Sequence, residues 1–158
     1  KSVRNFTGEA VSKEDLQKIV EAGMAAPTGM NKQPWSFVVV TDRQVLDKLL
    51  EAIPSKKMLA KAGAAIIICA IPEKSTKEMS IIDCSLAGEN MLLAIESLGL
   101  GGLWTAAYPM DDIMNPLRTI LGIPENVIPV NVMPIGHPDG SDKPKDKYKE
   151  ENLHWNKW

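Results

Sequence analysis

Residues Met79 to Leu98 predict a long helix that is apolar on almost every side. A helix on the surface of a single domain usually has one apolar stripe and one polar face, whereas a helix without a polar face must be covered all round. The stretch therefore predicts a helix in the centre of a domain or at a contact between subunits. Its large apolar side chains are Ile81, Ile82, Leu86, Met91, Leu92, Leu93, Ile95 and Leu98.

Shorter elements alternate before and after this helix. Ser12, with Asp15 three residues later, resembles a capping box at the start of a helix that ends before Pro27. Asp42 is expected to cap a second helix, which Pro54 stops. The other expected elements are a helical turn at 58–61, a helix capped by Asp111 and ending at Leu121, and strands at 35–40, 64–71, 103–107 and 127–135.

Two of these strands carry more specific signals. The stretch from Ala64 to Ile71 is continuously apolar, which is typical of a strand buried on both faces. The last strand contains Pro129 and Pro134, and because proline has no backbone N–H, we expect an edge strand or a bulge there. Alternation of helices and strands alone suggests a doubly wound sheet. The chain has no G-x-G-x-x-G after its first strand and no P-loop pattern, so neither common nucleotide fold is supported.

Composition excludes several classes of protein. The chain has 158 residues, of which 44% are hydrophobic, and we expect one domain over residues 1–158. A net charge of -2 without a basic face argues against a nucleic-acid partner. No apolar stretch approaches the roughly 20 residues that span a bilayer, so we expect no membrane contact. Cys69 and Cys84 lie in apolar stretches, which predicts buried free thiols and a cytoplasmic location.

The side chains of this chain offer little catalytic chemistry of their own. The two histidines, His137 and His154, do not pair with cysteines at metal-ligand spacing, so we expect no metal site. There is no G-x-S-x-G nucleophile elbow. We therefore expect no catalytic side chain and infer that a cofactor supplies the difficult step of any reaction.

Two clusters near the amino terminus could bind a ligand. In an extended segment, Ser2 and Arg4 share one face and Val3 takes the other, so a hydroxyl and a guanidinium could contact an anion together. Between the first helix and the first strand, Asn31 and Gln33 offer donors and acceptors that suit the edge of a heterocycle. A solvated terminus and an ordinary polar loop are the alternatives for these two clusters.

Two further clusters lie later in the chain. Residues 89–104 contain the end of the long helix and a glycine-rich turn into a strand, which taken alone indicates packing and no ligand. Lys145 and Lys147 would project together from an extended tail and could hold a phosphate. A solvated charged tail is the alternative for this last pair.

Together, in this order and at these separations, the four clusters resemble the nitroreductase family of FMN-dependent enzymes. The opening K-S-V-R is similar to the family's R-R-S-x-R motif without its first arginine. Residues 26–37, A-P-T-G-M-N-K-Q-P-W-S-F, resemble the family's A-P-S-x-x-N-x-Q-P-W-x-F signature, which is the most specific match. The segments S-L-G-L-G-G-L-W, I-P-V-N-V-M-P-I-G-H-P and K-P-K-D-K-Y resemble its central helix end, last core strand and carboxy-terminal phosphate contact.

The resemblance implies an α+β fold, with a mostly antiparallel sheet wrapped by helices. It also implies an intertwined homodimer that binds FMN at its interface through both chains. The implied activity is transfer of a hydride from NADH or NADPH, through N5 of the flavin, to a small flat acceptor such as a nitroaromatic or a quinone. The alternatives are a protein that binds or stores FMN without catalysis, and a flavin-dependent relative of the dehalogenase type.

The resemblance also implies a role for individual residues. Lys1 and Ser2 are expected at the FMN phosphate, and Arg4 near N1 and O2 of the flavin, where a fixed cation stabilises the charge of the reduced ring. The backbone N–H near Ala106 is expected to face N5. The full set of implied cofactor-binding residues is Lys1, Ser2, Arg4, Pro27, Thr28, Gly29, Asn31, Trp104, Thr105, Ala106, Lys145 and Lys147.

Three positions depart from the family pattern. The family usually has arginine where Lys1 stands, and often where Lys147 stands. Lysine keeps the charge but loses bidentate geometry, so we expect a looser hold on FMN. Ala106 occupies a position where some members carry glutamate, which changes how a substrate would be oriented.

Overall fold

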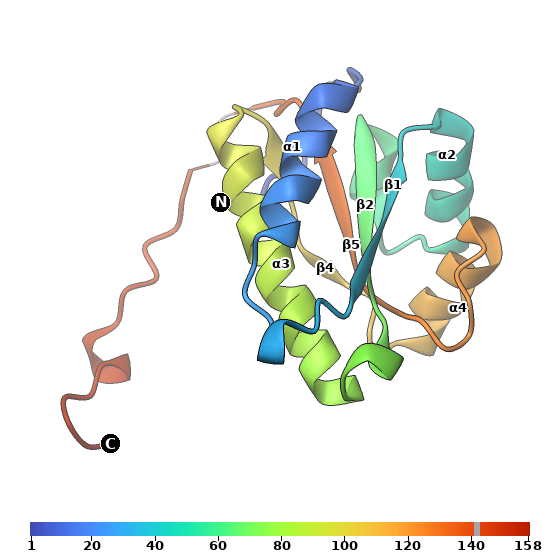
Figure 1. The fold of residues 1–158 in the computed structure, drawn as a ribbon. Helices are drawn as coiled ribbons and strands as arrows, with labels where there is room; N and C mark the ends of the chain where they lie inside the picture. Colours follow the sequence, from blue (N-terminus) through green and yellow to red (C-terminus); the bar gives the residue numbers. More distant parts are fainter. Residues whose placement is uncertain (141–142) are drawn as a thin grey trace.

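The computed structural model describes residues 1–140 and 143–158 and has one antiparallel sheet with helices on both faces (Figure 1). The strand order is β1-β2-β5-β3, and β4 pairs with β5 on the same side as β3. Every strand pair is antiparallel, which confirms the mostly antiparallel α+β sheet and excludes the doubly wound alternative. The strands are β1 (Trp35–Val40), β2 (Ala64–Ala70), β3 (Gly101–Gly102), β4 (Thr105–Ala106) and β5 (Ile128–Gly136).

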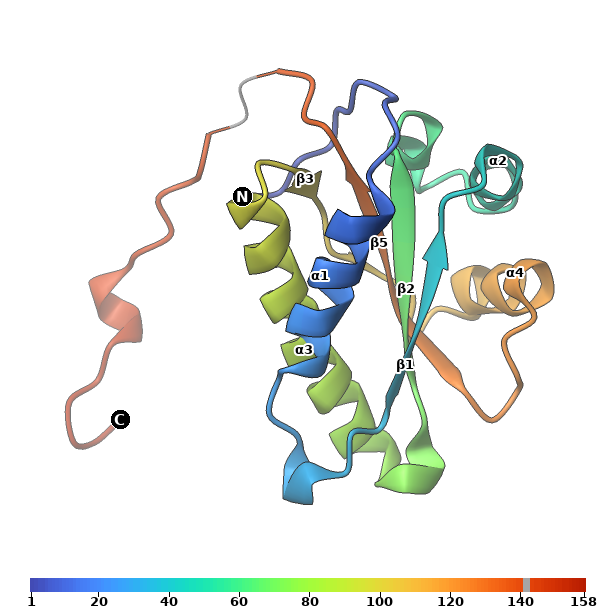
Figure 2. The ribbon, with the colours of Figure 1, turned by 45° about the horizontal axis from the view of Figure 1, so that its top comes forward.

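Four α-helices form the two outer layers in the described part of the chain. Figures 1 and 2 show α1 and α3 on one face of the sheet and α2 and α4 on the other. Short 3-10 helices join several of these elements. The α-helices are α1 (Lys13–Met24), α2 (Arg43–Ala52), α3 (Lys77–Ser97) and α4 (Asp111–Leu121), and the 3-10 helices are η1 (Gly29–Asn31), η2 (Lys57–Ala60), η3 (Pro72–Lys74) and η4 (Glu150–Asn152).

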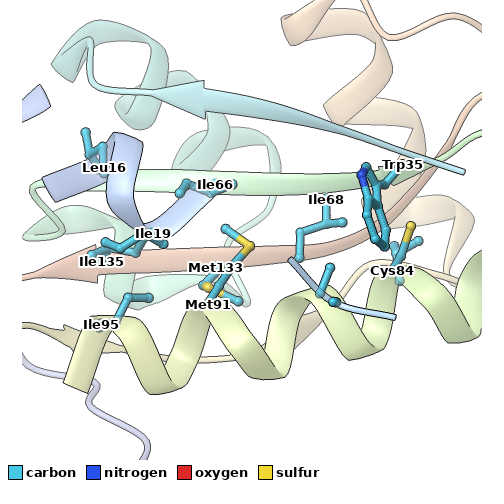
Figure 3. Packing of buried hydrophobic residues seen from close by; sticks show 14 of the residues in the cluster. Leu16, Ile19, Trp35, Ile66, Ile68, Cys84, Met91, Ile95, Met133 and Ile135 are labelled. Atoms are coloured by element: carbon cyan, nitrogen blue, oxygen red, sulfur yellow. The ribbon is translucent and has the colours of Figure 1, made fainter. Parts of the chain in front are cut away.

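Two hydrophobic cores lie on the two faces of the sheet. All seven residues of β2 are buried, and its side chains alternate between the cores, with Ile66 and Ile68 toward α1 and α3 and Ile67 toward α2 and α4. Figure 3 shows the first core, where Ile66 and Met133 from the sheet meet Met91 from α3. A strand covered on both faces needs no polar alternation, which explains the continuous apolar run.

The prolines of the last strand do not mark an edge. β5 is central, because β2 pairs on one side and β3 and β4 pair on the other, so the edge prediction is wrong. The bulge prediction is confirmed: the register with β2 shifts so that Ile68 faces Asn131 while Cys69 faces Pro129. Pro134 lies at the gap between β3 and β4, where its missing N–H interrupts the ladder. The expected strand 103–107 is therefore reduced to β4 at 105–106, and β3 lies just before the predicted range, at 101–102.

Helix ends follow the local rules except at α4. Ser12 accepts a hydrogen bond from the Asp15 N–H, and Asp42 accepts from the N–H of Gln44, as the capping patterns predict. The α4 cap is Met110, with no side-chain hydrogen bond, and Asp111 is the first helical residue instead of the cap. Asp111 therefore acts at α4 through its charge near the positive end of the helix dipole.

The long helix α3 has two different faces. Its buried side carries mostly small or flexible residues, among them Ala87, Gly88 and Met91. Its outer side carries exposed apolar side chains: Met79, Ile82, Leu86 and Leu93. The helix thus lies against the sheet and also presents an uncovered apolar stripe. Among the described residues, no helix is long and apolar enough to cross a membrane.

Candidate functional site

The outer edge of the sheet, formed by β3 and β4, points alternate peptide groups in opposite directions. The N–H groups of Leu103 and Ala107 donate to β5, to the carbonyls of Pro134 and Val130 at 3.3 and 2.9 Å. In an extended chain the neighbouring residues, 102, 104 and 106, must then point their N–H and C=O groups away from β5. The segment therefore presents the backbone groups of Trp104 and Ala106 on a free edge, which is the side of β3 and β4 with which no strand of the described sheet pairs.

The amino-terminal segment lies along one end of this free edge. The Val3 N–H donates to the Gly102 carbonyl at 3.0 Å, and the Val3 side chain packs against Gly101. Val3 is buried while Ser2 and Arg4 are exposed, as the expected alternation of an extended segment requires. Adding a Cβ at Gly101 would bring it 2.7 Å from Val3, so glycine allows the segment to approach this closely.

A cationic cavity joins the amino-terminal segment to the tail. It has a volume of about 380 Å³ and is lined by Lys1, Ser2, Arg4, Lys143, Pro144, Lys145 and Lys147. None of the described residues that line it is acidic. The first and fourth sequence clusters, about 140 residues apart in the chain, therefore meet here, and five positive charges converge on one space.

A second cavity, of about 450 Å³, shares Arg4 with the first. Lys57 and Lys61 line this cavity together with Arg4 and the acidic Asp139, and sequence reasoning did not single them out. Lys57 opens η2, directly after the connection from α2. The only signal in the sequence was the adjacent pair Lys56-Lys57 following Pro54, which by itself reads as a solvated turn.

Lys56 differs from its neighbour because it is buried, with 6% of its surface exposed. Its Nζ donates to the Ala106 carbonyl at 2.8 Å, on the free edge of β4. Burial lowers the pKa of Lys56, and the carboxylate of Asp112 partly opposes that shift. Sequence reasoning also missed this residue.

The signature loop between α1 and β1 is held in an unusual backbone conformation. Met30, Asn31 and Gln33 have φ values of 53°, 55° and 48°, in the left-handed region that residues other than glycine seldom adopt. Asp83 of α3 is buried, and its carboxylate accepts the Gly29 N–H at 3.2 Å. The loop is therefore preorganised, and Asp83 is a further residue that sequence reasoning missed.

Hydrogen bonds within this loop also fix its side chains. The Thr28 hydroxyl accepts the Gln33 N–H at 3.1 Å, and the Gln33 side-chain amide donates to Asn31 Oδ1 at 3.1 Å. Pro27 and Asn31 are exposed, while Thr28 and Gly29 are half-buried. The loop offers its polar groups outward, away from its own domain core.

Trp104 lies between the loop and the amino-terminal segment along α3. Its indole ring packs against Gly88, where an added Cβ would lie 2.0 Å from the ring. Thr105 donates its hydroxyl proton to the Val132 carbonyl at 2.6 Å, which fixes β4 against β5. Trp104, Thr105 and Ala106 are all half-buried and so border on solvent.

The expected site residues form two groups at different levels of α3. Gly29 contacts Asp83, whereas Gly102, which binds the amino-terminal segment, packs against Ile95. Residues 83 and 95 are 12 positions apart, so the two levels are about 18 Å apart along the helix axis at 1.5 Å per residue. Figures 1 and 2 likewise place η1 at one end of α3 and the amino terminus toward the other. One chain alone does not bring the loop to the cationic cavity.

Other chemistries find no support in the described part of the chain. No group of three or more His, Cys, Asp and Glu side chains there could hold a metal ion. Cys69 and Cys84 are free and buried, as expected, and burial raises the pKa of each thiol to about 12. Thiolate chemistry is therefore disfavoured at neutral pH.

Comparisons with known proteins agree with this architecture. The profile of the Nitroreductase family matches residues 1–56 and 54–137. A protein of Archaeoglobus fulgidus, assigned to the NADH dehydrogenase/NAD(P)H nitroreductase class, is 42% identical over 163 residues, which cover 100% of this chain and 94% of the relative. The chain belongs to the nitroreductase family.

Solved structures share the fold over the whole chain. A Bacteroides thetaiotaomicron protein of the same NAD(P)H nitroreductase class has a TM-score of 0.95 and 45% identity, with 100% of this chain and 93% of that chain covered. An FMN-dependent nitroreductase from Clostridium difficile has a TM-score of 0.92 and 27% identity, with 100% and 95% covered.

Proposed function

We propose that this chain is an FMN-dependent oxidoreductase that uses NADH or NADPH to reduce a small flat acceptor, such as a nitroaromatic or a quinone. Family membership and the names of the relatives support an NAD(P)H-dependent flavin enzyme. The observation that carries the proposal in this chain is the cationic cavity, together with the free edge to which the amino-terminal segment links it through the hydrogen bond from Val3 to Gly102. FMN would bring a phosphate to the cavity and a flat ring with polar edge atoms to the backbone groups of that edge.

The residues present fit the parts of FMN. Lys1, Ser2, Lys145 and Lys147 would hold the phosphate, since they supply charge and a hydroxyl around one space. Arg4 lines both cavities, so it can serve the phosphate end and the pyrimidine end of the cofactor, where Lys57 adds a second cation.

The free edge of β4 would face the ring. When bound, FMN accepts a hydride at N5 from the nicotinamide and passes two electrons to the acceptor. Trp104, Thr105 and Ala106 would run past the ring, and the Ala106 N–H would donate toward N5. Arg4 and Lys57 would stabilise negative charge on the reduced pyrimidine. No side chain acts as nucleophile in this proposal; the chain orients flat ligands and balances charge.

A second copy of the chain would complete the site. The loop residues Pro27, Thr28, Gly29 and Asn31 are about 18 Å along α3 from the amino-terminal group. The apolar stripe of α3 and the exposed tail residues Trp155 and Trp158 are surfaces that a partner would cover. We therefore propose a homodimer in which the loop of one copy meets the cationic cavity of the other.

The activity is tested with purified protein and added FMN. We expect a yellow protein that oxidises NADH or NADPH only when a nitroaromatic or quinone is supplied. A protein that gains no flavin spectrum with FMN contradicts the proposal. Flavin binding without turnover with any acceptor would instead identify a storage protein, and release of halide from a haloaromatic would identify the dehalogenase type.

The shared site is tested by complementation between Arg4→Ala and Asn31→Ala. If each site takes Arg4 from one copy and Asn31 from the other, a mixed dimer holds one intact site and one doubly altered site. Co-expression of the two inactive variants should restore about a quarter of the wild-type activity, because about half of the dimers are mixed. No restoration above the single variants would contradict a site made by two copies.

A further inference from the structure

Lys56 carries a positive charge to the free edge of β4. The Val3 N–H binds the Gly102 carbonyl at one end of this edge, and Lys56 Nζ binds the Ala106 carbonyl at the other, at 3.0 and 2.8 Å. Residue 106 directs both its C=O and its N–H to the same side, because Ala107 turns its N–H to β5. The ammonium group thus lies on the side of Ala106 where its backbone N–H is presented.

The need of the Ala106 carbonyl for a hydrogen-bond donor does not explain why residue 56 is a lysine. Water or a neutral donor satisfies a carbonyl at the margin of a site, whereas burying an ammonium group carries a desolvation penalty. Lys56 is 6% exposed, and that burial lowers its pKa, while the Asp112 carboxylate favours the charged form. The neighbouring Lys57 faces the second cavity at little such penalty, since it is exposed.

The connection that carries Lys56 is itself fixed. The Lys56 N–H donates to the Ile53 carbonyl, and the Lys56 carbonyl accepts the Leu59 N–H, each at 2.9 Å. Leu59 is fully buried, which anchors η2 in the core beneath α2. One rigid turn therefore places Lys56 on β4 and Lys57 in the cavity that Arg4 also lines.

We propose that Lys56 is a positioning residue of the cofactor site: its ammonium group fixes the Ala106 peptide that would face the flavin and adds positive charge that favours the reduced cofactor. This inference rests on the proposed function. A charge near the ring stabilises the more negative, reduced form more than the oxidised form. Lys56 consequently sets how strongly the protein draws electrons from the nicotinamide.

The experiment measures the midpoint potential of FMN bound to the full chain and, by fluorescence, the affinity for oxidised FMN. Lys56→Met removes the charge and the donor, Lys56→Gln removes the charge but keeps a neutral N–H donor on a shorter side chain, and Lys56→Arg keeps both charge and donor. Lys48→Met is the matched control, since Lys48 is exposed on α2 and its loss changes the net charge equally. Thermal unfolding of each variant without FMN reports folding separately.

We expect Lys56→Met and Lys56→Gln to lower the midpoint potential, so that the affinity for reduced FMN relative to oxidised FMN falls by about tenfold or more. The affinity for oxidised FMN should change by less than about threefold, because the charge acts mainly on the reduced form. Lys56→Arg should stay close to the wild type, and Lys48→Met should match it. A purely structural role would lower the unfolding temperature without this selective loss.

An unchanged potential in Lys56→Met overturns the inference while leaving the proposed function intact. A wild-type potential in Lys56→Gln also overturns it, because the charge would then have no role. If Lys56→Met does not fold, the difference between Lys56→Arg and Lys56→Gln decides. Failure of the wild-type protein to bind FMN is seen before any variant is made, and overturns the proposed function together with this inference.

Discussion

The two faces of α3 show how one helix can serve two kinds of contact. Toward the sheet, Ala87, Met91 and Ile95 are fully or almost fully buried, and they fit between the strands and α1. On the opposite face, Ile82, Leu86 and Leu93 are 52%, 42% and 62% exposed. Both faces are apolar, so composition does not distinguish them; only packing does.

This difference shows that the inner face of α3 makes the core contacts that one chain needs to fold. A stable monomer gains nothing from a stripe of large exposed apolar side chains, and such a stripe on a regular helix face indicates a contact with another molecule. The inner face should therefore control folding, and the outer face should control assembly and cofactor binding. Three sets of substitutions and one measurement of thiol reactivity test this division.

The largest effect is expected on the outer face. Leu86→Glu with Leu93→Glu places two charges on each copy where the proposed dimer excludes water, and should weaken association at least about 100-fold. Sedimentation should show monomers that no longer retain FMN, while circular dichroism keeps its helical signal. Lys48→Glu, on the exposed face of α2, is the control and should remain dimeric. A double variant that stays a yellow dimer would refute the assignment of this face.

The inner face should respond through stability. Met91→Ala removes a fully buried side chain that packs against Gly23 of α1, and should lower the free energy of unfolding by about 2–5 kcal/mol. Met91→Leu, which keeps the volume, should cost less than about 1.5 kcal/mol. Chemical denaturation measures both. If both variants lost the same free energy of unfolding, the cavity left by the smaller alanine side chain would not be the cause.

A smaller effect is expected where α3 meets Trp104. In Gly88→Ala the new methyl group overlaps the indole ring, so Trp104 must move, at a cost of about 1–3 kcal/mol. The tryptophan fluorescence should shift, and FMN affinity should fall because Trp104 borders the proposed site. Gly99→Ala changes a glycine with open space around it but a φ of 72°, and should strain the turn without moving the ring. Unaltered fluorescence in Gly88→Ala would contradict the packing.

The smallest effect at neutral pH concerns the thiols. Burial raises the pKa of Cys84, on the inner face, and of Cys69 from 9.0 to about 12. The unfolded chain then loses these protons near pH 9 and the folded chain only near pH 12, so stability falls as pH rises between those values. Native protein should leave a thiol reagent unreacted at pH 8, and denatured protein should react at two thiols. Rapid reaction of the native protein would show that the thiols are accessible.

The sequence predicts well whatever depends on neighbours in the chain. Ser12 and Asp42 cap their helices because the groups they satisfy lie within three residues. Val3 turns inward and Ser2 and Arg4 outward because extended chains alternate. The family resemblance added the overall fold, since the antiparallel pairing of β2 with both neighbours has no local signal.

The features that sequence reasoning missed depend on distant contacts. Lys56 and Ala106 are 50 positions apart, and Asp83 and Gly29 are 54 apart. Neither pair has a local pattern, so a lysine after a turn and an aspartate in an apolar helix both look ordinary. The central place of β5 was missed for a related reason: Pro129 and Pro134 indicate where a ladder is interrupted but not how many strands flank it.

The free edge of β3 and β4 also has a consequence for solubility. An exposed strand edge is a template on which another chain can add a strand and begin to aggregate. Here β3 and β4 are two residues each, Val3 already occupies Gly102, and the Lys56 ammonium occupies Ala106. A foreign strand would have to displace a buried charge to pair along this edge. In the folded chain, the lysine that we assign to the cofactor site therefore also blocks strand addition at Ala106 before any cofactor binds.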